Sequence, residues 1–545
     1  MAEAAAPMEG TQRPRVSAYA WYALFVLVLV YVVNFIDRQI LSILVADIQA
    51  DLGVTEAEIG FLYGTAFAVF YALFGIPLGR LADSWYRGRL MAIGLALWSS
   101  MTVASGFAST LGQLTAARIG VGIGEASASP AAYSMIADSF PKERRATALS
   151  IYSAGLYIGG ALSLPIGGAV ASGWNRAYPA AELAPLGLAG WQAAFLAVGL
   201  PGLLLALWVL SLREPQRGAM DGHPQPIVRP NAWRDFGREL FAIIPPFTLF
   251  NLAALSAKAL RTNLVALAVI VLAAYGLVLL TGNWPQWVAY GLGVYAVFSW
   301  VQSLRFRDPA THALIWGHWV VVLITAAFGS IAFVAYASTF WFPRYAEATF
   351  YAGPLAPGLF FPGMTAKTEV GLILGTTNAV TAALGVIIGG YLSDLWRQRD
   401  VNGRLYINML AAVLPLPIIT YMLTTDSATG FYVASPLAHL FSSLWVGAAV
   451  ATLQDLVLPR MRGTAGATYI LGTTMVGLAL GPYYAGQVAA AAGSLAAGIF
   501  ALFAMVPLTL TALWIASRHL GALEASKEER ARAAESADAA PLGAV

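Results

Sequence analysis

The sequence has no cysteine and few charged residues. Asp, Glu, Lys and Arg make up 11% of its 545 residues, whereas soluble domains average about 25%. The absence of cysteine excludes disulfides, thiol catalysis and thiolate metal sites. There is no HExxH motif and no clustered set of His and Asp ligands, and the Gly-rich stretches lack the Lys-Ser/Thr pair of a phosphate-binding loop. We therefore expect no metal or other cofactor and no ATP-driven pump. We also expect no nucleic-acid partner, and no enzyme activity because of the duplicated halves described below.

Long apolar runs dominate the sequence. Hydrophobic residues make up 59% of it, and the mean hydropathy is +0.69. A membrane-spanning helix needs about 20 predominantly apolar residues, and the runs of that length form two groups of six. The predicted spans lie near 19–46, 57–82, 90–109, 111–138, 146–171 and 190–212, and near 312–346, 368–393, 404–425, 432–456, 463–490 and 493–517.

Between the groups, two more runs are long enough to span, and a Pro-Pro pair in 239–258 predicts a broken or interfacial segment. The predicted fold is an all-α polytopic membrane protein with two six-helix halves and an extra apolar hairpin. Its predicted parts are an N-terminal tail (1–18), a first half (19–212), a central loop with the two extra helices near 263–281 and 285–303 (213–311), a second half (312–517) and a C-terminal tail (518–545).

The two halves repeat each other in sequence. Residues 58–85 align with 369–396, with 13 of 28 positions identical. Shared apolar composition does not readily place charged and Trp residues in register. Parallel six-helix halves joined by a long loop are a transporter architecture. The matched pairs include Glu58/Glu369, Gly64/Gly375, Gly79/Gly390, Asp83/Asp394 and Trp85/Trp396, and, in a second alignment offset by 317, Arg145/Arg462 and Pro165/Pro482.

Basic residues in the short loops predict the orientation. The loops after spans two, four, eight and ten hold eleven Lys or Arg residues, and the opposite loops hold only Arg176, Arg344 and Lys367. Because cytoplasmic loops carry the excess of Lys and Arg, both termini and the central loop are predicted to be cytoplasmic.

The loop "GRLADSWYRGR" (79–89) joins the second and third spans. Gly79 permits close helix approach, Asp83 can pair with Arg or accept from backbone N–H groups, and Arg87 and Arg89 anchor the cytoplasmic face. The echo "GGYLSDLWRQR" at 389–399 argues against an ordinary positively charged loop.

This loop resembles the signature loop of the major facilitator superfamily. "LTAARIGVGIGEA" (114–126) resembles the fourth-helix motif of that superfamily, and "GLYIGGALSLPIGG" (155–168) its fifth-helix motif, which is associated with exporters and antiporters. "NFIDRQILSIL" (34–44) and the stretch 118–152 resemble the spinster branch. That branch includes transporters of lysophospholipids and sphingolipid metabolites, alongside many bacterial members of unknown cargo. The resemblance implies a bacterial homologue in the inner membrane.

The resemblance implies roles for particular residues. Asp83, with Gly79, Arg87 and Arg89 in the same loop, would act as a conformational gate. In the outward-facing state Asp83 would bridge to span eleven and to Arg144 or Arg145.

The resemblance also implies a charged site on spans one and four. Asp37 and Arg38 would form an acid–base pair, Glu125 would be the coupling acid, and Arg118 and Ser129 would line the cavity.

Geometry adds to this reading of the charged residues. Arg118 and Glu125 are seven residues apart, about two turns, and share a helical face. A charged side chain that faces lipid in the middle of a membrane-spanning helix costs at least about 2.5–3.5 kcal/mol. Together with Asp37 they should therefore face a cavity and compensate one another. They could instead form a static ion pair that locks spans one and four.

The second half lacks these charges, because Ser435 and Ser442 stand at the positions equivalent to Arg118 and Glu125. Coupling is therefore predicted in the first half, and the second half would supply mainly apolar and aromatic surface. His439 could titrate near neutral pH or serve as a structural hydrogen-bonding residue. The candidate aromatic residues, which could also be interface anchors, are Tyr336, Phe340, Trp341 and Trp445.

The sequence thus predicts a monomeric secondary transporter embedded in membrane lipids. It would be driven by protons, work by alternating access and carry an amphipathic small molecule such as a lysolipid. The alternative is an exporter of hydrophobic drugs or organic acids. Coupling to sodium instead of protons stays open. A membrane-embedded lipid enzyme using Glu125 with Ser127 or Ser129 is disfavoured by the duplicated halves.

Overall fold

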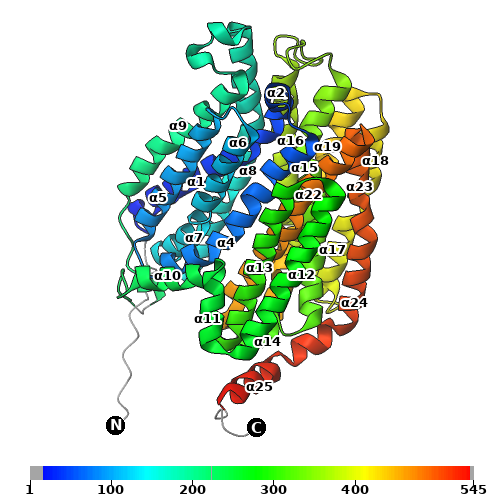
Figure 1. Ribbon diagram of the computed structural model, residues 1–545. Helices are drawn as coiled ribbons and strands as arrows, with labels where there is room; N and C mark the ends of the chain where they lie inside the picture. Colours follow the sequence, from blue (N-terminus) through cyan, green and yellow to red (C-terminus); the bar gives the residue numbers. More distant parts are fainter. Residues whose placement is uncertain (1–15, 222–223, 540–545) are drawn as a thin grey trace, which may run out of the picture.

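The computed structural model describes residues 16–221 and 224–539 as a bundle of long helices (Figure 1). Within these residues, extended pairing is limited to two isolated bridges, Arg217 with Gln225 and Pro357 with Thr365. The all-α prediction is therefore confirmed. We call the end of the bundle that carries α10, α14 and α25 the lower end, and the end that carries α2 the upper end (Figure 1).

The first half contains six crossings, three of which are split. The splits follow Gln39, Tyr63 and Glu125. Its helices are α1 (Ala18–Gln39), α2 (Leu41–Leu52), α3 (Glu56–Tyr63), α4 (Thr65–Ala82), α5 (Arg87–Ser105), α6 (Leu111–Glu125), α7 (Ala128–Ser139), α8 (Lys142–Ala177) and α9 (Gly190–Leu210), with 3-10 turns η1 (Ala181–Leu183) and η2 (Pro185–Gly187) in the upper loop.

The central segment is helical as well. It breaks between α10 and α11 at Pro245 and Pro246, because proline has no N–H for a helix interior. This break agrees with the expected interruption. The elements are η3 (Ala219–Asp221), α10 (Ala232–Ile243), α11 (Phe247–Leu255), α12 (Ala257–Thr281), α13 (Trp284–Arg307) and α14 (Pro309–Ile315).

The second half ends in a helix that the sequence did not clearly predict. The tail beyond residue 518 continues α24, and α25 then packs against α14 with Ala531 buried. The elements are α15 (Trp319–Phe350), α16 (Ala366–Arg397), α17 (Gly403–Val413), α18 (Pro415–Thr424), α19 (Ala428–Ser442), α20 (Trp445–Asp455), η4 (Pro459–Met461), α21 (Arg462–Gly472), the π-helix η5 (Thr473–Leu478), α22 (Ala479–Ala492), α23 (Leu495–Ala501), η6 (Leu502–Ala504), α24 (Met505–Ala525) and α25 (Lys527–Ala539).

Eleven helical segments in the described part of the chain are long and apolar enough to cross a membrane. The predicted spans at 90–109, 111–138 and 285–303 fold as α5, α6 with α7, and α13, but they fall outside this set. The α6–α7 crossing is broken and carries charged residues, and α5 and α13 each have Arg residues at the lower end. The chain is a multi-pass membrane protein.

The halves touch at the upper end through small residues. A Cβ added at Gly60 would lie 2.4 Å from the carbonyl oxygen of Pro482, so α3 and α22 are in backbone contact there. The halves also touch along a second line of contact, or seam, where α8 meets α16. A Cβ at Gly371 would lie 2.5 Å from the carbonyl oxygen of Leu164 there. The upper end is therefore closed along both seams.

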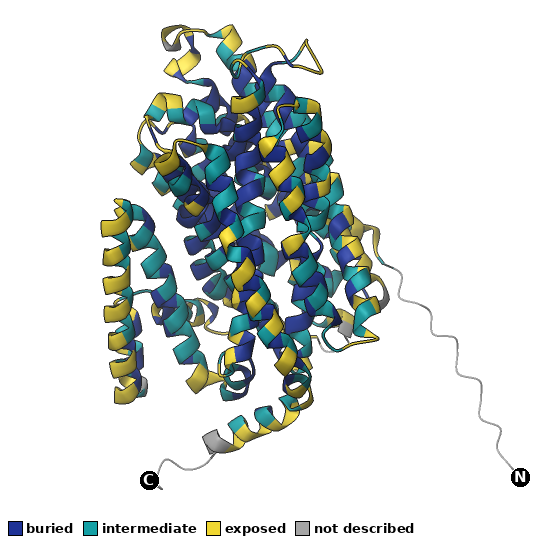
Figure 2. Ribbon diagram, turned by 90° about the vertical axis from the view of Figure 1, so that its right-hand side faces the viewer, coloured by how far each residue is buried: buried dark blue, intermediate teal, exposed yellow. Residues whose placement is uncertain are grey.

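The extra hairpin is exposed on one side only. The apolar window of α12 has none of its residues buried, whereas α13 packs against α4 and η5. A Cβ at Gly293 would lie 2.7 Å from Met475 and 2.9 Å from Val69, one residue from each half. Figure 2 shows the buried residues gathered inside the bundle and the exposed ones along its outside. The helix α13 thus covers the seam between α4 and η5.

Candidate functional site

The charges of the first and fourth crossings meet in a buried ion pair. Arg38 at the end of α1 donates to Glu125 Oε2 from Nη2 at 2.6 Å and from Nε at 3.2 Å. The side chain of Glu125 is fully buried and that of Arg38 is 12% exposed. Two N–H groups on one carboxylate oxygen give a charge-assisted contact that fixes both side chains.

Aromatic rings surround the guanidinium of Arg38. Its central carbon lies 4.6 Å from the ring centroid of Phe67, 4.8 Å from that of Phe35 and 5.1 Å from that of Tyr71. Cation–π contacts of this kind are worth about 0.5–2 kcal/mol, more where water is excluded. The rings therefore compensate part of the cost of burying the arginine.

Asp37 and Arg118 lie beside this pair without forming an ion pair with each other. Arg118 Nη1 donates to the main-chain oxygen of Asp37 at 3.3 Å. Within the described residues neither carboxylate oxygen of Asp37 has a hydrogen-bond partner, and Nε and Nη2 of Arg118 have none. The partner of Glu125 is thus Arg38 of α1, not Arg118 on its own helix. The site therefore contains a buried carboxylate without a hydrogen-bond partner and a buried guanidinium that is only partly hydrogen-bonded.

Two of the predicted aromatic residues reach this site from α15. Tyr336 lies close enough to interact electrostatically with Arg38. The ring of Phe340 stacks on Tyr63 with centroids 4.1 Å apart, and the Tyr63 hydroxyl donates to Gln39 at 3.1 Å. The second half thus contributes aromatic surface next to the charges.

The other predicted contacts in the second half belong to its packing. Trp341 is fully buried and its indole N–H donates to the carbonyl oxygen of Pro482 at 3.0 Å. His439 contacts the Thr339 hydroxyl at 3.3 Å and the carbonyl oxygen of Ser435 at 3.0 Å. These bonds favour the structural reading of His439. In the first half, Ser129 stands at the start of α7 beside Tyr152.

At the lower end, Arg87 is the centre of a second charged cluster. It is fully buried and pairs with Asp138 of α7 and with Glu214 after α9, the latter at 2.6 Å. It also donates to Ser134 Oγ and to the carbonyl oxygen of Pro215, both at 2.7 Å. One guanidinium therefore ties α5, α7 and the central loop together.

The second half repeats this contact. Arg404 pairs with Asp455, and both residues lie 317 positions beyond Arg87 and Asp138. Arg404 also binds Asp394 at 3.0 Å. The sequence reading did not pick out Asp138 or Glu214. The offset that aligns Arg145 with Arg462 could have identified Asp138, because it also aligns Asp138 with Asp455.

The contact predicted for Asp83 of the gate is not formed in this conformation. The side chain of Asp83 is exposed and forms no ion pair or hydrogen bond with the described residues, unlike that of its repeat partner Asp394. A Cβ at Gly79 would meet open space, and the exposed Arg89 lies over the Tyr86 ring at 4.5 Å. Arg144 is exposed and Arg145 partly buried at the start of α8. The expected bridge from Asp83 to span eleven and to Arg144 or Arg145 is therefore absent from this closed-upper-end form.

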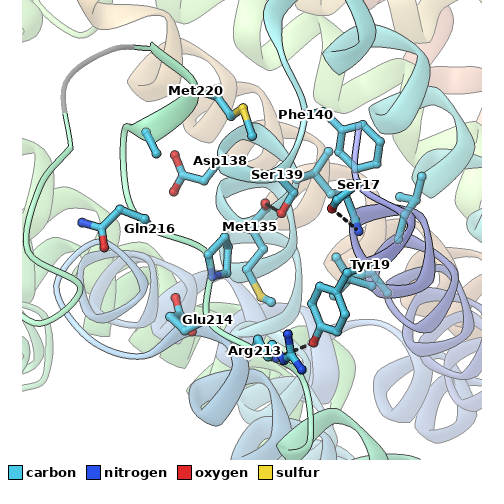
Figure 3. A pocket seen from close by; sticks show the side chains of 17 residues that line it. Ser17, Tyr19, Met135, Asp138, Ser139, Phe140, Arg213, Glu214, Gln216 and Met220 are labelled. Carbon is cyan, nitrogen blue, oxygen red and sulfur yellow. Dashed lines mark hydrogen bonds between the residues drawn. The ribbon is translucent and has the colours of Figure 1, made fainter. Parts of the chain in front are cut away.

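A cavity of about 260 Å³ lies beside the Arg87 cluster, between α1, α7 and residues 213–220 (Figure 3). Met135 of α7 and Phe140, which follows α7, line it. Arg213 and Tyr19 also line the cavity, and the central carbon of the Arg213 guanidinium lies 5.1 Å from the centroid of the Tyr19 ring. Asp138 and Glu214 contribute to its polar side.

The fold and the site define a class of protein: a polytopic helical membrane protein whose two halves meet around buried charges. A family model described as the Major Facilitator Superfamily matches residues 27–469. The chain therefore belongs to the major facilitator superfamily, a family of transporters.

Individual relatives extend over most of the chain. The MFS-type efflux pump of Mycolicibacterium smegmatis is 25% identical over 473 residues, which cover 86% of this chain and 84% of that protein. Protein spinster of Drosophila melanogaster is 23% identical, covering 86% and 62%. A bacterial homolog of the human lysosomal transporter spinster, crystallised inward-facing and unoccupied, gives a TM-score of 0.61 at 24% identity, covering 94% and 98%. These matches confirm the resemblance to the spinster branch.

Proposed function

We propose that this chain is a proton-coupled secondary transporter that works by alternating access and carries an amphipathic anion of the lysolipid class. Protonation of Glu125, with Asp37 as a second acid, would couple proton movement to cargo movement. Arg38 and Arg118 would bind the cargo head group. The observation that carries the proposal is the buried Arg38–Glu125 pair, in which one arginine serves a carboxylate that it could release.

The coupling follows from competition for a single cation. While Arg38 holds Glu125, the carboxylate has a counter-ion and stays ionised. An anionic head group that binds Arg38 takes that counter-ion away, and Glu125 then gains a proton because an unpaired buried carboxylate is costly. Cargo and proton are thereby linked although they do not touch.

The cargo class rests on the mixture of groups around the pair. The two arginines suit an anionic head group, and the rings of Phe67, Tyr336 and Phe340 offer apolar surface next to it. The relatives include spinster proteins and an efflux pump. A probable L-galactonate transporter of Escherichia coli is 30% identical over 194 residues, 35% of this chain, so a sugar acid is the second candidate.

We also propose that the lower end is cytoplasmic, since it carries most of the Lys and Arg residues of the short loops. In that orientation the conformation with the upper end closed faces inward. The division into halves at 19–212 and 312–517, with both tails in the cytoplasm, belongs to the same proposal.

The test is uptake into proteoliposomes with and without an imposed pH gradient. The probes are a labelled lysophospholipid, a sphingoid-base phosphate, a sugar acid and a lipophilic dye. Glu125→Gln should abolish accumulation driven by the gradient and spare downhill exchange. Arg38→Gln and Arg118→Ala should weaken cargo binding.

Glu58→Gln is the matched control, because Glu58 only caps α3 through Thr55 and glutamine can do the same. If Glu125→Gln and Asp37→Asn both still accumulate cargo with the parental pH dependence, the coupling site lies elsewhere. Accumulation of the sugar acid alone would replace the lysolipid by the second candidate.

A further inference from the structure

At the closed upper end, a further buried ion pair joins the two halves. Lys367 in the first turn of α16 binds Asp47 of α2, and the two residues are 320 positions apart. The side chain of Lys367 is 1% exposed and that of Asp47 is 12% exposed. Neither residue takes part in the Arg38–Glu125 site or in the Arg87 cluster.

The position of Lys367 does not favour its own helix. A cation in the first turn opposes the helix dipole, and burying an ammonium group costs several kcal/mol unless it is paired. The N-cap of α16 is already provided by Thr365, whose side chain accepts from the Thr368 N–H. The lysine therefore depends on Asp47, a residue of the other half.

The packing around the pair also exists only while the halves touch. A Cβ at Gly168 of α8, in the first half, would lie 2.9 Å from the carbonyl oxygen of Lys367 in α16 of the second half. On the other seam, Thr65 Oγ1 donates to the carbonyl oxygen of Ala479 at 2.7 Å. Separation of the halves would remove all of these contacts together.

We propose that Asp47 and Lys367 form the latch that holds the upper end shut and that must open in every transport cycle. They act as positioning residues that set the balance between the two access states, without contacting cargo. When the upper end opens, water reaches both charges and replaces the pair, so the latch is reversible. The inference rests on alternating access, which is part of the proposed function, but not on proton coupling or on the cargo.

The test measures access to the upper seam. Because the chain has no cysteine, a single introduced cysteine, Ala57→Cys, can report access to this seam. Ala57 is buried on α3 near Tyr483 of the other half. A membrane-impermeant maleimide is applied without cargo and without a pH gradient. Asp47→Asn and Lys367→Met should each raise the labelling rate about tenfold, because either change leaves one buried charge unpaired.

Exchange of the two charges separates a latch from a general effect on folding. Asp47→Lys combined with Lys367→Asp should return labelling to the parental rate, since an acidic residue in the first turn of α16 also suits the helix dipole. Lys367→Arg should label like the parent. Asp235→Asn, which breaks an exposed pair with Arg238 in α10, is the control.

Each outcome decides the proposal. Parental labelling in both single variants overturns it, provided that they stay monodisperse after purification. Fast labelling in the charge-exchanged variant also overturns it, because the pair would then not be the cause. Because no cargo or gradient is present, failure here is distinct from failure of the proton-coupling test on Glu125.

Discussion

Replacing Gly60 by alanine should open the upper end of the transporter. The added Cβ would lie 2.4 Å from the carbonyl oxygen of Pro482 and 2.7 Å from Cα of Tyr483, whereas ordinary contacts begin at 3.4 Å. All the close atoms belong to backbone, so no side chain can move aside. The helices α3 and α22 must separate locally by about 1 Å, the difference between these distances.

The energetic consequence falls on one state only. Overpacking of this kind costs about 1–3 kcal/mol, and the cost disappears once the halves separate. A difference of that size shifts a two-state equilibrium by about 5–150-fold. Gly60→Ala should therefore move much of the population to the open-upper-end form.

The assay is a distance measurement between spin labels at the upper end. Cysteines introduced at Ser109 and Asp426, exposed residues in loops of different halves, give one distance across the mouth. Gly75→Ala is the matched control in the second crossing, because a Cβ there meets no atom within 4 Å. Equal distance distributions for Gly60→Ala, Gly75→Ala and the parent would refute the reasoning.

Three further outcomes are expected. Arg38→Gln should lower the melting temperature more than Glu125→Gln. Both substitutions break an ion pair whose one-sided loss costs about 3–5 kcal/mol, but only Arg38→Gln also removes the cation–π contact with Phe67. The reverse order of melting temperatures in a thermal-shift series would contradict this. Asp83→Asn should raise labelling of cysteines placed between the two halves at the lower end, because the resemblance assigns Asp83 to a gate of the other access state. The melting temperature should stay nearly unchanged, since the Asp83 side chain forms no ion pair in the present form; unchanged labelling argues against its gate role. Deleting residues 239–305 with a flexible link should leave reduced but measurable transport, because the deletion uncovers the α4–η5 seam and spares the charged site; complete loss in a well-folded variant would place α13 in the transport path.

Much of the fold could be predicted because hydropathy and duplication are properties of the sequence itself. The apolar runs located the helices, and the aligned repeats divided them into two halves. The burial of α13 against the two halves could not be predicted, because an apolar helix has a similar composition whether it faces lipid or protein. What distinguishes α13 is the absence of a side chain at Gly293, which allows contact with Val69 and Met475.

The sequence predicted which charged residues form the candidate site, but not which of them form the ion pair. Helical spacing places Arg118 and Glu125 on one face, yet the partner of Glu125 comes from α1. Which long side chain reaches which carboxylate depends on the approach of two helices, and a single sequence does not contain that distance. The contact of Asp83 was expected from the resemblance only for the outward-facing state, and a single structure shows one access state.

The matching pairs Arg87–Asp138 and Arg404–Asp455 give the molecule an internal reference. Removing either arginine breaks the same kind of contact at the same end of the bundle, in one half or the other. Once the effect of their other partners, Glu214 for Arg87 and Asp394 for Arg404, is subtracted, the remaining difference between the two variants measures how unequally the two halves contribute to transport. A symmetric machine would respond identically, whereas one whose coupling charges lie on a single side should be more sensitive on that side.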